Sequence, residues 1–248
     1  MSKLAIFGSS KYSIDVLNHT PNKLLSNHEI TVISNNSLEH NFSTKKYNNK
    51  TSYECDLAVS IGFSQKININ KVNSKYGLFN IHQSLLPNYR GRHPIQAMII
   101  NGEREYGCTL HVLDTEFDTG NIVKQISKRF KNVPNELTVK KLVTKQSAKL
   151  LIYLLINFTN QFNNTSKQPL YGEYIAPKRS SKDSEIKNSF DINKVRNMIK
   201  ALMHDDYRPY VIIKSEKIYI KNVFLYKLQN KNLLEFYLNN QKVYLEKY

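Results

Sequence analysis

Two side chains that together can stabilise a negative charge and move a proton stand close in the sequence. Asn80 and His82 are separated by one residue and follow the short apolar run 77–79. In an extended strand, residues at i and i+2 project from the same face. An amide N–H can stabilise a developing oxyanion while an imidazole transfers a proton. The same spacing is also common in turns and on surfaces, so the neighbouring residues decide its meaning.

These neighbours extend the pair into a longer motif. It comprises Asn80, His82, Ser84, Leu85, Leu86, Pro87, Tyr89, Arg90, Gly91 and Pro94. About thirty-five residues beyond His82 the chain carries Asp118-Thr119-Gly120. In order and spacing this set resembles the signature of the folate-dependent formyltransferases: Asn-x-His-x-Ser-Leu-Leu-Pro, Tyr-Arg-Gly-x-x-Pro and a later Asp-x-Gly. The resemblance covers residues 1 to about 160 and is loose beyond them.

The resemblance implies transfer of a formyl group from N10-formyltetrahydrofolate to a primary amine, without a metal ion. Asn80 would donate to the oxyanion, and His82 would assist it and help the amine lose its proton. Asp118 would orient His82 and stabilise its protonated form. The resemblance also implies a folate pocket beside the Leu-Leu-Pro element, with Leu85, Leu86, Asp114 and Phe117 as cofactor-binding residues. Core packing explains the two leucines equally well.

Other polar residues have two readings. Ser9, Ser10 and Lys11 follow an apparent first strand and could contact a phosphate, or form an ordinary strand-to-helix turn. They lack the Gly-x-Gly-x-x-Gly fingerprint, which gives no support for a dinucleotide cofactor. The spacing of the histidines matches no metal-ligand pattern. We expect His111, in the middle of a predicted strand, to be packed or hydrogen-bonded in the core.

The order of predicted elements favours an α/β fold. Short apolar strands at 4–8, 30–33, 57–61 and 77–81 alternate with helices, which predicts a doubly wound, mostly parallel, Rossmann-like sheet. Two further strands, 109–113 and 122–126, surround the loop with Asp118, and a long helix covers about 135–161. We therefore expect a catalytic domain over residues 1–178. Residues 163–184 contain Pro, Gly, Ser and Lys and should form a connecting segment. Residues 179–248 should form a small subdomain with a helix at 192–203, strands at 211–214, 217–228, 233–238 and 243–245, and a hairpin turn at Asn239-Asn240.

This tail bears on which amine accepts the formyl group. The family acts on initiator methionyl-tRNA, glycinamide ribonucleotide or amino sugars linked to nucleoside diphosphates. A tail of about 70 residues is too short for the tRNA enzymes and too long for the ribonucleotide enzymes. The chain looks most like the nucleotide-sugar N-formyltransferases, which implies a dTDP-amino sugar substrate, a role in surface polysaccharide such as O-antigen, and a homodimer through the C-terminal β region. The candidate substrate-binding residues are Ser9, Ser10, Lys11, Arg90, Lys178, Arg179, Tyr207 and Arg208.

Composition leaves two alternatives open. The net charge of +16 is spread along a Lys- and Asn-rich chain, which reads as surface composition more readily than as a nucleic-acid site. A methionyl-tRNA formyltransferase with a shortened tail and a basic nucleic-acid-binding protein on this scaffold remain the alternatives. The two cysteines show no metal-ligand spacing, and no signal peptide or apolar membrane segment is evident. These features predict a cytoplasmic protein without membrane partners.

Overall fold

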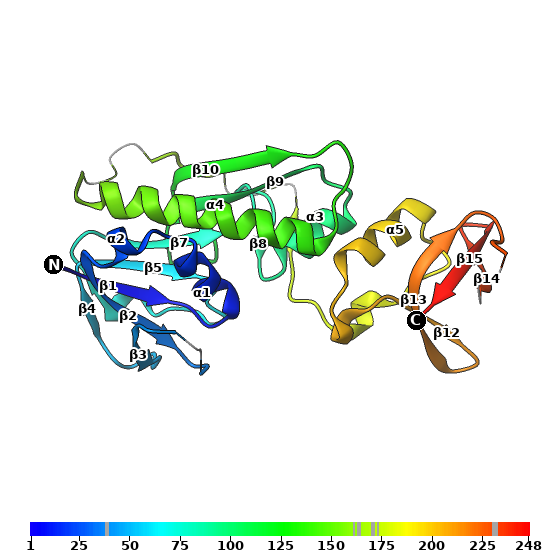
Figure 1. Ribbon diagram of the computed structural model, residues 1–248, viewed down its shortest axis with the longest axis horizontal. Helices are drawn as coiled ribbons and strands as arrows, with labels where there is room; N and C mark the ends of the chain where they lie inside the picture. Colours follow the sequence, from blue (N-terminus) through cyan, green and yellow to red (C-terminus); the bar gives the residue numbers. More distant parts are fainter. Residues whose placement is uncertain (38–39, 161, 163–164, 170–171, 173, 230–232) are drawn as a thin grey trace. The chain divides into compact units, whose positions relative to one another are not determined.

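The computed structural model describes residues 1–248 except 38–39, 161, 163–164, 170–171, 173 and 230–232 (Figure 1). The chain divides into two compact units. The first contains Met1–Arg92, Tyr106–Lys128 and Lys141–Ile175, and the second contains His93–Glu105, Arg129–Lys140 and Ala176–Tyr248. The predicted domain boundary after residue 178 is not tested by this division and stays a prediction.

A seven-stranded sheet forms the centre of the first unit, in the order β10-β9-β7-β5-β1-β2-β3. Its strands are β1 (Ser2–Phe7), β2 (His28–Ser34), β3 (Ser43–Lys46), β5 (Leu57–Ile61), β7 (Leu78–His82), β9 (Glu105–Val112) and β10 (Ile122–Arg129). The five neighbouring strands β7, β5, β1, β2 and β3 are parallel, and β9 pairs with β7 in the antiparallel direction. The predicted mostly parallel, Rossmann-like sheet is confirmed.

Alternate residues of β1 pack on opposite faces of this sheet, as the two-residue period of a strand requires. Ala5 and Phe7 face an aromatic cluster that includes Tyr47, Tyr53 and the partly buried Phe63. The Phe7 ring meets the Tyr53 ring edge to face at 5.5 Å. A two-stranded element of β4 (Tyr53–Cys55) and β6 (Val72–Ser74) carries part of this cluster. The cluster extends along the sheet face from Leu78 at the start of β7 to Phe7 at the end of β1.

Two helices are joined by a buried polar contact. Helix α1 (Lys11–Asn18) carries Tyr12, and helix α4 (Glu136–Asn157) carries Ser147. Tyr12 Oη lies 2.6 Å from Ser147 Oγ, and Ser147 Oγ lies 3.2 Å from Cys108 Sγ on β9. Burial raises the pKa of the Cys108 thiol to about 12, which keeps it protonated and unreactive. This contact fixes both helices to each other and to the sheet.

The second unit contains α3 (Pro94–Ile100), α5 (Ile192–Ala201) and a four-stranded sheet in the order β12-β13-β15-β14. Its strands are β12 (Tyr210–Ile213), β13 (Glu216–Phe224), β14 (Leu233–Leu238) and β15 (Gln241–Lys247). Asn239 and Asn240 have φ angles of 46° and 64°, as a two-residue hairpin turn between β14 and β15 requires. The predicted helix, strands and turn of this region are confirmed.

Several short elements do not match a sequence pattern. Strand β3 has four exposed residues and no apolar alternation, so its sequence carries no strand signal. The short helix α2 (Asn22–Leu25) and helix α3 were also not predicted. The predicted strand 217–228 ends at Phe224 instead. The predicted connecting segment 163–184 lies partly outside the described residues.

Candidate active site

Strand β7 brings Asn80 and His82 to the carboxyl edge of the sheet. The strand lies between β5 and β9, and Asn80 is directly opposite His111 of β9. Asn80 Nδ2 donates a hydrogen bond to Asp118 Oδ1 at 3.2 Å, and His82 Nδ1 lies 3.5 Å from the same oxygen. The three residues predicted from the motif therefore meet at one carboxylate, within the first compact unit.

Asp118 stands on the loop between β9 and β10, in a backbone conformation that few residues adopt. Its φ is 58°, in the left-handed region that Asp and Asn tolerate better than most side chains. A Cβ at Gly120 would collide with the carbonyl group of Val112, so the loop folds back onto β9 only with glycine at this position. The Gly91 N–H donates to Asp118 Oδ2 at 3.0 Å. These constraints explain the spacing of the Asp-x-Gly sequence.

Opposing effects act on the Asp118 carboxyl. Burial disfavours its ionised form, but the charges of His82 and His111 and the Gly91 N–H outweigh burial and hold the pKa of Asp118 well below its ordinary value. The carboxylate is 10 % exposed as a side chain, so solvent screens these interactions little. Asp118 is therefore a fixed negative charge at neutral pH.

His82 has its hydrogen positions dictated by a backbone neighbour. Its Nε2 lies 2.8 Å from the carbonyl oxygen of Tyr89, and because a carbonyl only accepts, Nε2 carries a hydrogen. In a neutral ring Nδ1 is then bare, beside the Asp118 carboxylate. A proton that arrives at Nδ1 converts the pair into an imidazolium–carboxylate ion pair. Nδ1 is thus the atom of His82 that can accept a proton.

His111 completes the group, although the motif did not assign it a role. It is 1 % exposed, and its Nδ1–H donates to the Val112 carbonyl at 2.8 Å. Its Nε2 lies 3.0 Å from Asn80 Nδ2 and 3.6 Å from Asp118 Oδ1. The burial expected from its place in the strand is confirmed. A neutral His111 accepts from the Asn80 amide, so it orients that side chain.

Gln168 supports the same loop from a segment without a recognisable motif. It is buried, and its Nε2 donates to the carbonyls of Asp118 and Gly120 at 3.1 and 2.6 Å. Its Oε1 accepts from Arg90 Nη2 at 2.8 Å, and the same Nη2 donates to the Pro169 carbonyl at 2.9 Å. Arg90 therefore anchors the loop through Gln168. No sequence signal marks Gln168, because its partners are about 50 and 78 residues away.

The candidate folate residues lie in different surroundings. Leu86 is buried; its N–H donates to Thr109 Oγ1 at 3.1 Å and its carbonyl accepts from Gln125 at 2.9 Å. Leu85 is half-buried. Asp114 accepts from the Thr115 N–H at 2.6 Å and so shapes the start of the loop. The Phe117 ring is 61 % exposed, which leaves an apolar surface directly beside Asp118.

The other predicted substrate-binding residues have their described contacts away from the Asp118 carboxylate. Ser9 is buried; it donates to the Gly62 carbonyl at 3.2 Å and accepts from the Ser64 N–H at 2.8 Å, while Ser10 lies 3.5 Å from the Gly62 carbonyl. Lys11 and Lys178 are exposed. In the second unit, Arg179 donates to the Asp183 carbonyl at 2.7 Å.

The other two second-unit candidates face aromatic rings. The Arg208 guanidinium lies 4.3 Å from the Tyr248 ring centroid, and the Tyr207 ring lies 6.3 Å from the His93 ring. Both side chains are half-buried. Their roles in substrate binding stay predictions.

Residues 7–155, more than half of the chain, match the formyl transferase family. The chain belongs to this family. It is 32% identical over 152 residues to a methionyl-tRNA formyltransferase of Staphylococcus epidermidis, a match that covers 61% of this chain and 49% of the relative. It is 34% identical over 132 residues to the bifunctional polymyxin resistance protein ArnA of Wigglesworthia glossinidia brevipalpis, covering 52% and 20%. The chain thus spans about half the length, or less, of these curated relatives.

Solved structures resemble the whole chain. WlaRD, a sugar 3N-formyltransferase crystallised with dTDP and 5-N-formyl-THF, superposes with a TM-score of 0.72 at 23% identity, covering 100% of this chain and 98% of that one. An N-formyltransferase of Helicobacter canadensis, in complex with folinic acid and dTDP-3-aminofucose, gives a TM-score of 0.70 at 21% identity, with both chains fully covered. At these identities the likeness shows the fold, including its C-terminal part.

Among the residues that the structure describes, no group of three or more His, Cys, Asp or Glu side chains is placed to hold a metal ion. The helices that the structure describes include none with the length and apolar character needed to cross a membrane.

Proposed function

We propose that the chain transfers a formyl group from N10-formyltetrahydrofolate to the amino group of a nucleoside-diphosphate amino sugar, with dTDP as the nucleotide. The convergence of Asn80, His82 and Asp118 at one buried carboxylate carries the proposal. The choice of acceptor is supported by full-length likeness to a structure described as a sugar 3N-formyltransferase and to an N-formyltransferase in complex with dTDP-3-aminofucose. A role in O-antigen synthesis, a cytoplasmic location and a homodimer through the C-terminal β region belong to the same proposal.

In this proposal the three side chains assist two steps: addition of the amine to the formyl carbon and cleavage of the bond between that carbon and N10. The sugar amine attacks the formyl carbon, and Asn80 stabilises the negative charge that develops on the formyl oxygen. His82 accepts the amine proton at Nδ1, and Asp118 stabilises the imidazolium that results. The bond between the formyl carbon and N10 then breaks, and His82 returns the proton to N10. The products are a formamide and tetrahydrofolate, so atoms and charge balance.

The resting contacts of Asn80 add one requirement. Its amide nitrogen donates towards both His111 and Asp118, and an amide has only two hydrogens. Asn80 must therefore release one of these contacts before it can donate to the formyl oxygen.

A different amine acceptor, methionyl-tRNA, also has support. Curated relatives of this chain include methionyl-tRNA formyltransferases of Staphylococcus epidermidis, which match over 61% and 73% of the chain. An acceptor panel decides between them: dTDP- and UDP-linked 3-amino and 4-amino sugars, methionyl-tRNA, glycinamide ribonucleotide and water, each with N10-formyltetrahydrofolate, with release of tetrahydrofolate as the readout. We expect turnover with a dTDP-amino sugar. Turnover with methionyl-tRNA alone would replace the proposal by the alternative, and release in water alone would indicate a hydrolase.

A further inference from the structure

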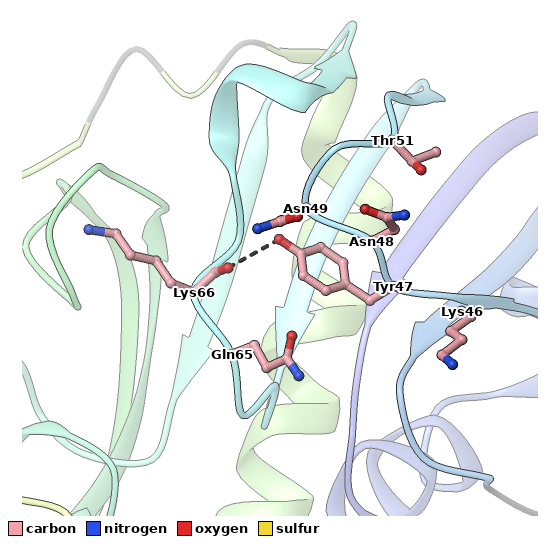
Figure 2. A pocket seen from close by; sticks show the side chains of 7 residues that line it. All are labelled: Lys46, Tyr47, Asn48, Asn49, Thr51, Gln65 and Lys66. Atoms are coloured by element: carbon pink, nitrogen blue, oxygen red, sulfur yellow. Dashed lines mark hydrogen bonds between the residues drawn. The ribbon is translucent and has the colours of Figure 1, made fainter.

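A polar pocket opens near the candidate active site, between the loop after β3 and the loop after β5 (Figure 2). Its volume is about 700 Å³, and it is lined by Lys46, Tyr47, Asn48, Asn49, Thr51, Gln65 and Lys66. All these residues belong to the first compact unit. Because parallel strands end at the same edge of a sheet, the pocket shares the carboxyl edge with His82.

The lining has the chemistry of an anion site. The lining residues carry two ammonium groups, three carboxamides and two hydroxyls, and no acidic residue is among them. Two more lysines, Lys45 and Lys50, adjoin it in the sequence and are exposed. Figure 2 shows the Lys46 and Lys66 side chains at opposite ends of the group, with amide side chains between them. Such a row suits an extended ligand whose negative charges are spaced along its length.

Hydrogen bonds hold the two loops together before any ligand arrives. Tyr47 Oη donates to the Lys66 carbonyl and accepts from the Asn68 N–H, both at 3.1 Å. Asn68 Nδ2 donates to the Asn49 carbonyl, also at 3.1 Å. The Tyr47 ring itself is buried and stacks on Tyr53 with centroids 6.0 Å apart. Its faces are therefore not available to a nucleobase, although it is the only aromatic residue of the lining.

One contact connects the pocket to the catalytic loop. The Lys66 ammonium lies 5.5 Å from the centroid of the exposed Phe117 ring, and Phe117 precedes Asp118. A ligand that packs on Phe117 and reaches past Lys66 would enter the pocket. The folate of the proposed reaction has this form, because it ends in a chain of γ-linked glutamates, each with one free carboxylate.

We propose that this pocket binds the poly-γ-glutamyl tail of the folate donor, an inference that rests on the proposed function. The spaced lysines match carboxylates that repeat along an extended chain. A diphosphate carries its charges on adjacent groups and lacks such a repeat. The chain then prefers polyglutamylated folate over the monoglutamate through contacts remote from the reacting carbon.

Binding of tetrahydrofolate to the full chain, measured by calorimetry without an acceptor, tests this inference. We expect the pentaglutamate to bind roughly five- to tenfold more tightly than the monoglutamate, since two exposed ion pairs of modest strength contribute. Lys46→Gln removes one of the two ion pairs and should reduce the preference to about two- to threefold. Lys50→Gln, in the same loop but outside the lining, is the matched control and should keep the preference.

Each outcome decides a different question. Equal affinity for the two folates, or an unchanged preference in Lys46→Gln, would overturn the inference and leave the proposed function intact. Binding of neither folate would overturn both. A weaker affinity of Lys46→Gln for dTDP, with an unchanged folate preference, would assign the pocket to the nucleotide and also overturn the inference. Lys66→Gln is a less clean variant because Lys66 contacts Phe117.

Discussion

At the scale of single residues, the site is organised around one carboxylate. Asp118 receives contacts from Asn80, His82, His111 and the Gly91 N–H. Asn80 and His82 come from β7, His111 comes from β9, and Gly91 follows β7 in the chain. Each contact either orients a side chain or stabilises the negative charge. Removal of one member leaves the others partly unpaired in a buried setting, which should lower stability as well as activity.

The first prediction concerns the three motif residues. Replacement of Asn80, His82 or Asp118 by alanine should in each case remove most turnover. Asn80→Ala should lower kcat by roughly 10²–10³-fold, as the loss of an oxyanion donor does. Circular dichroism and thermal unfolding should show that the variants remain folded. Rates close to wild type in all three variants would rule out the proposed mechanism.

A second prediction follows from the depressed pKa of Asp118. The ordinary pKa of an aspartate is 3.8. At a pH below this value, Asp118 is protonated in the unfolded chain but stays ionised in the native one. Native stability therefore falls as the pH drops, and the contribution of Asp118 is lost from about pH 5 downwards. Asp118→Asn has no ionisable carboxyl at this position, so it lacks this pH-dependent contribution. The difference in free energy of unfolding between wild type and variant should therefore shrink between about pH 5 and 3. Urea unfolding across this range measures it, and a constant difference would contradict it.

At the scale of elements, loops outside the motif hold the site in place. Gln168 bridges Arg90 to the carbonyls of Asp118 and Gly120. Gln168→Leu should lower kcat by about tenfold or more, because an Å-scale shift of a catalytic group is costly. It should also cost about 1–3 kcal/mol of stability, since it leaves buried polar groups unpaired.

The control for Gln168 is its exposed neighbour. Lys167→Gln should leave kcat and the melting temperature unchanged, because Lys167 lies on the surface. Gln168→Glu retains the acceptor for Arg90 but loses the donor to the loop, so it should resemble Gln168→Leu in kcat. Wild-type kcat in both Gln168 variants would show that the loop is held without this residue.

A fourth prediction concerns the turn between β12 and β13. Lys214 and Ser215 have φ angles of 48° and 68°, a conformation that costs non-glycine residues roughly 1–2 kcal/mol each. Lys214→Asn with Ser215→Gly provides the residues that such a hairpin turn prefers, and should raise the free energy of unfolding by about 1 kcal/mol. Thermal unfolding measures the gain. Asn240→Gly, in the equivalent turn between β14 and β15, should give a smaller one.

At the scale of the whole molecule, the net charge of +16 raises the question of whether the protein binds nucleic acid. The basic residues are distributed along the chain, and the pocket lysines are proposed to bind carboxylates. We therefore expect only weak binding to a random DNA duplex, with few phosphate contacts and a shallow dependence on salt. Fluorescence anisotropy from 50 to 200 mM salt measures the slope. Submicromolar affinity that falls steeply with salt would support the nucleic-acid alternative.

Local patterns were sufficient to predict much of this protein. Residues 57–61 and 233–238 form strands with the predicted ends, because apolar runs and alternation report local burial. Asn80, His82 and Asp118 were predicted from their types and motif spacing, and the structure brings them together. Asn239 and Asn240 predicted their turn because few residues tolerate a positive φ.

Only the tertiary structure revealed the partners that complete the site. His111 reads as an ordinary core histidine until β9 pairs with β7 and places it opposite Asn80. Gln168 and the lysine-lined pocket join segments that no periodicity connects. Strand β3 has no apolar pattern of its own and is a strand because it pairs with β2. A sequence pattern reports what each segment buries locally, whereas these features depend on contacts between residues far apart in the chain, which exist only once the sheet has formed.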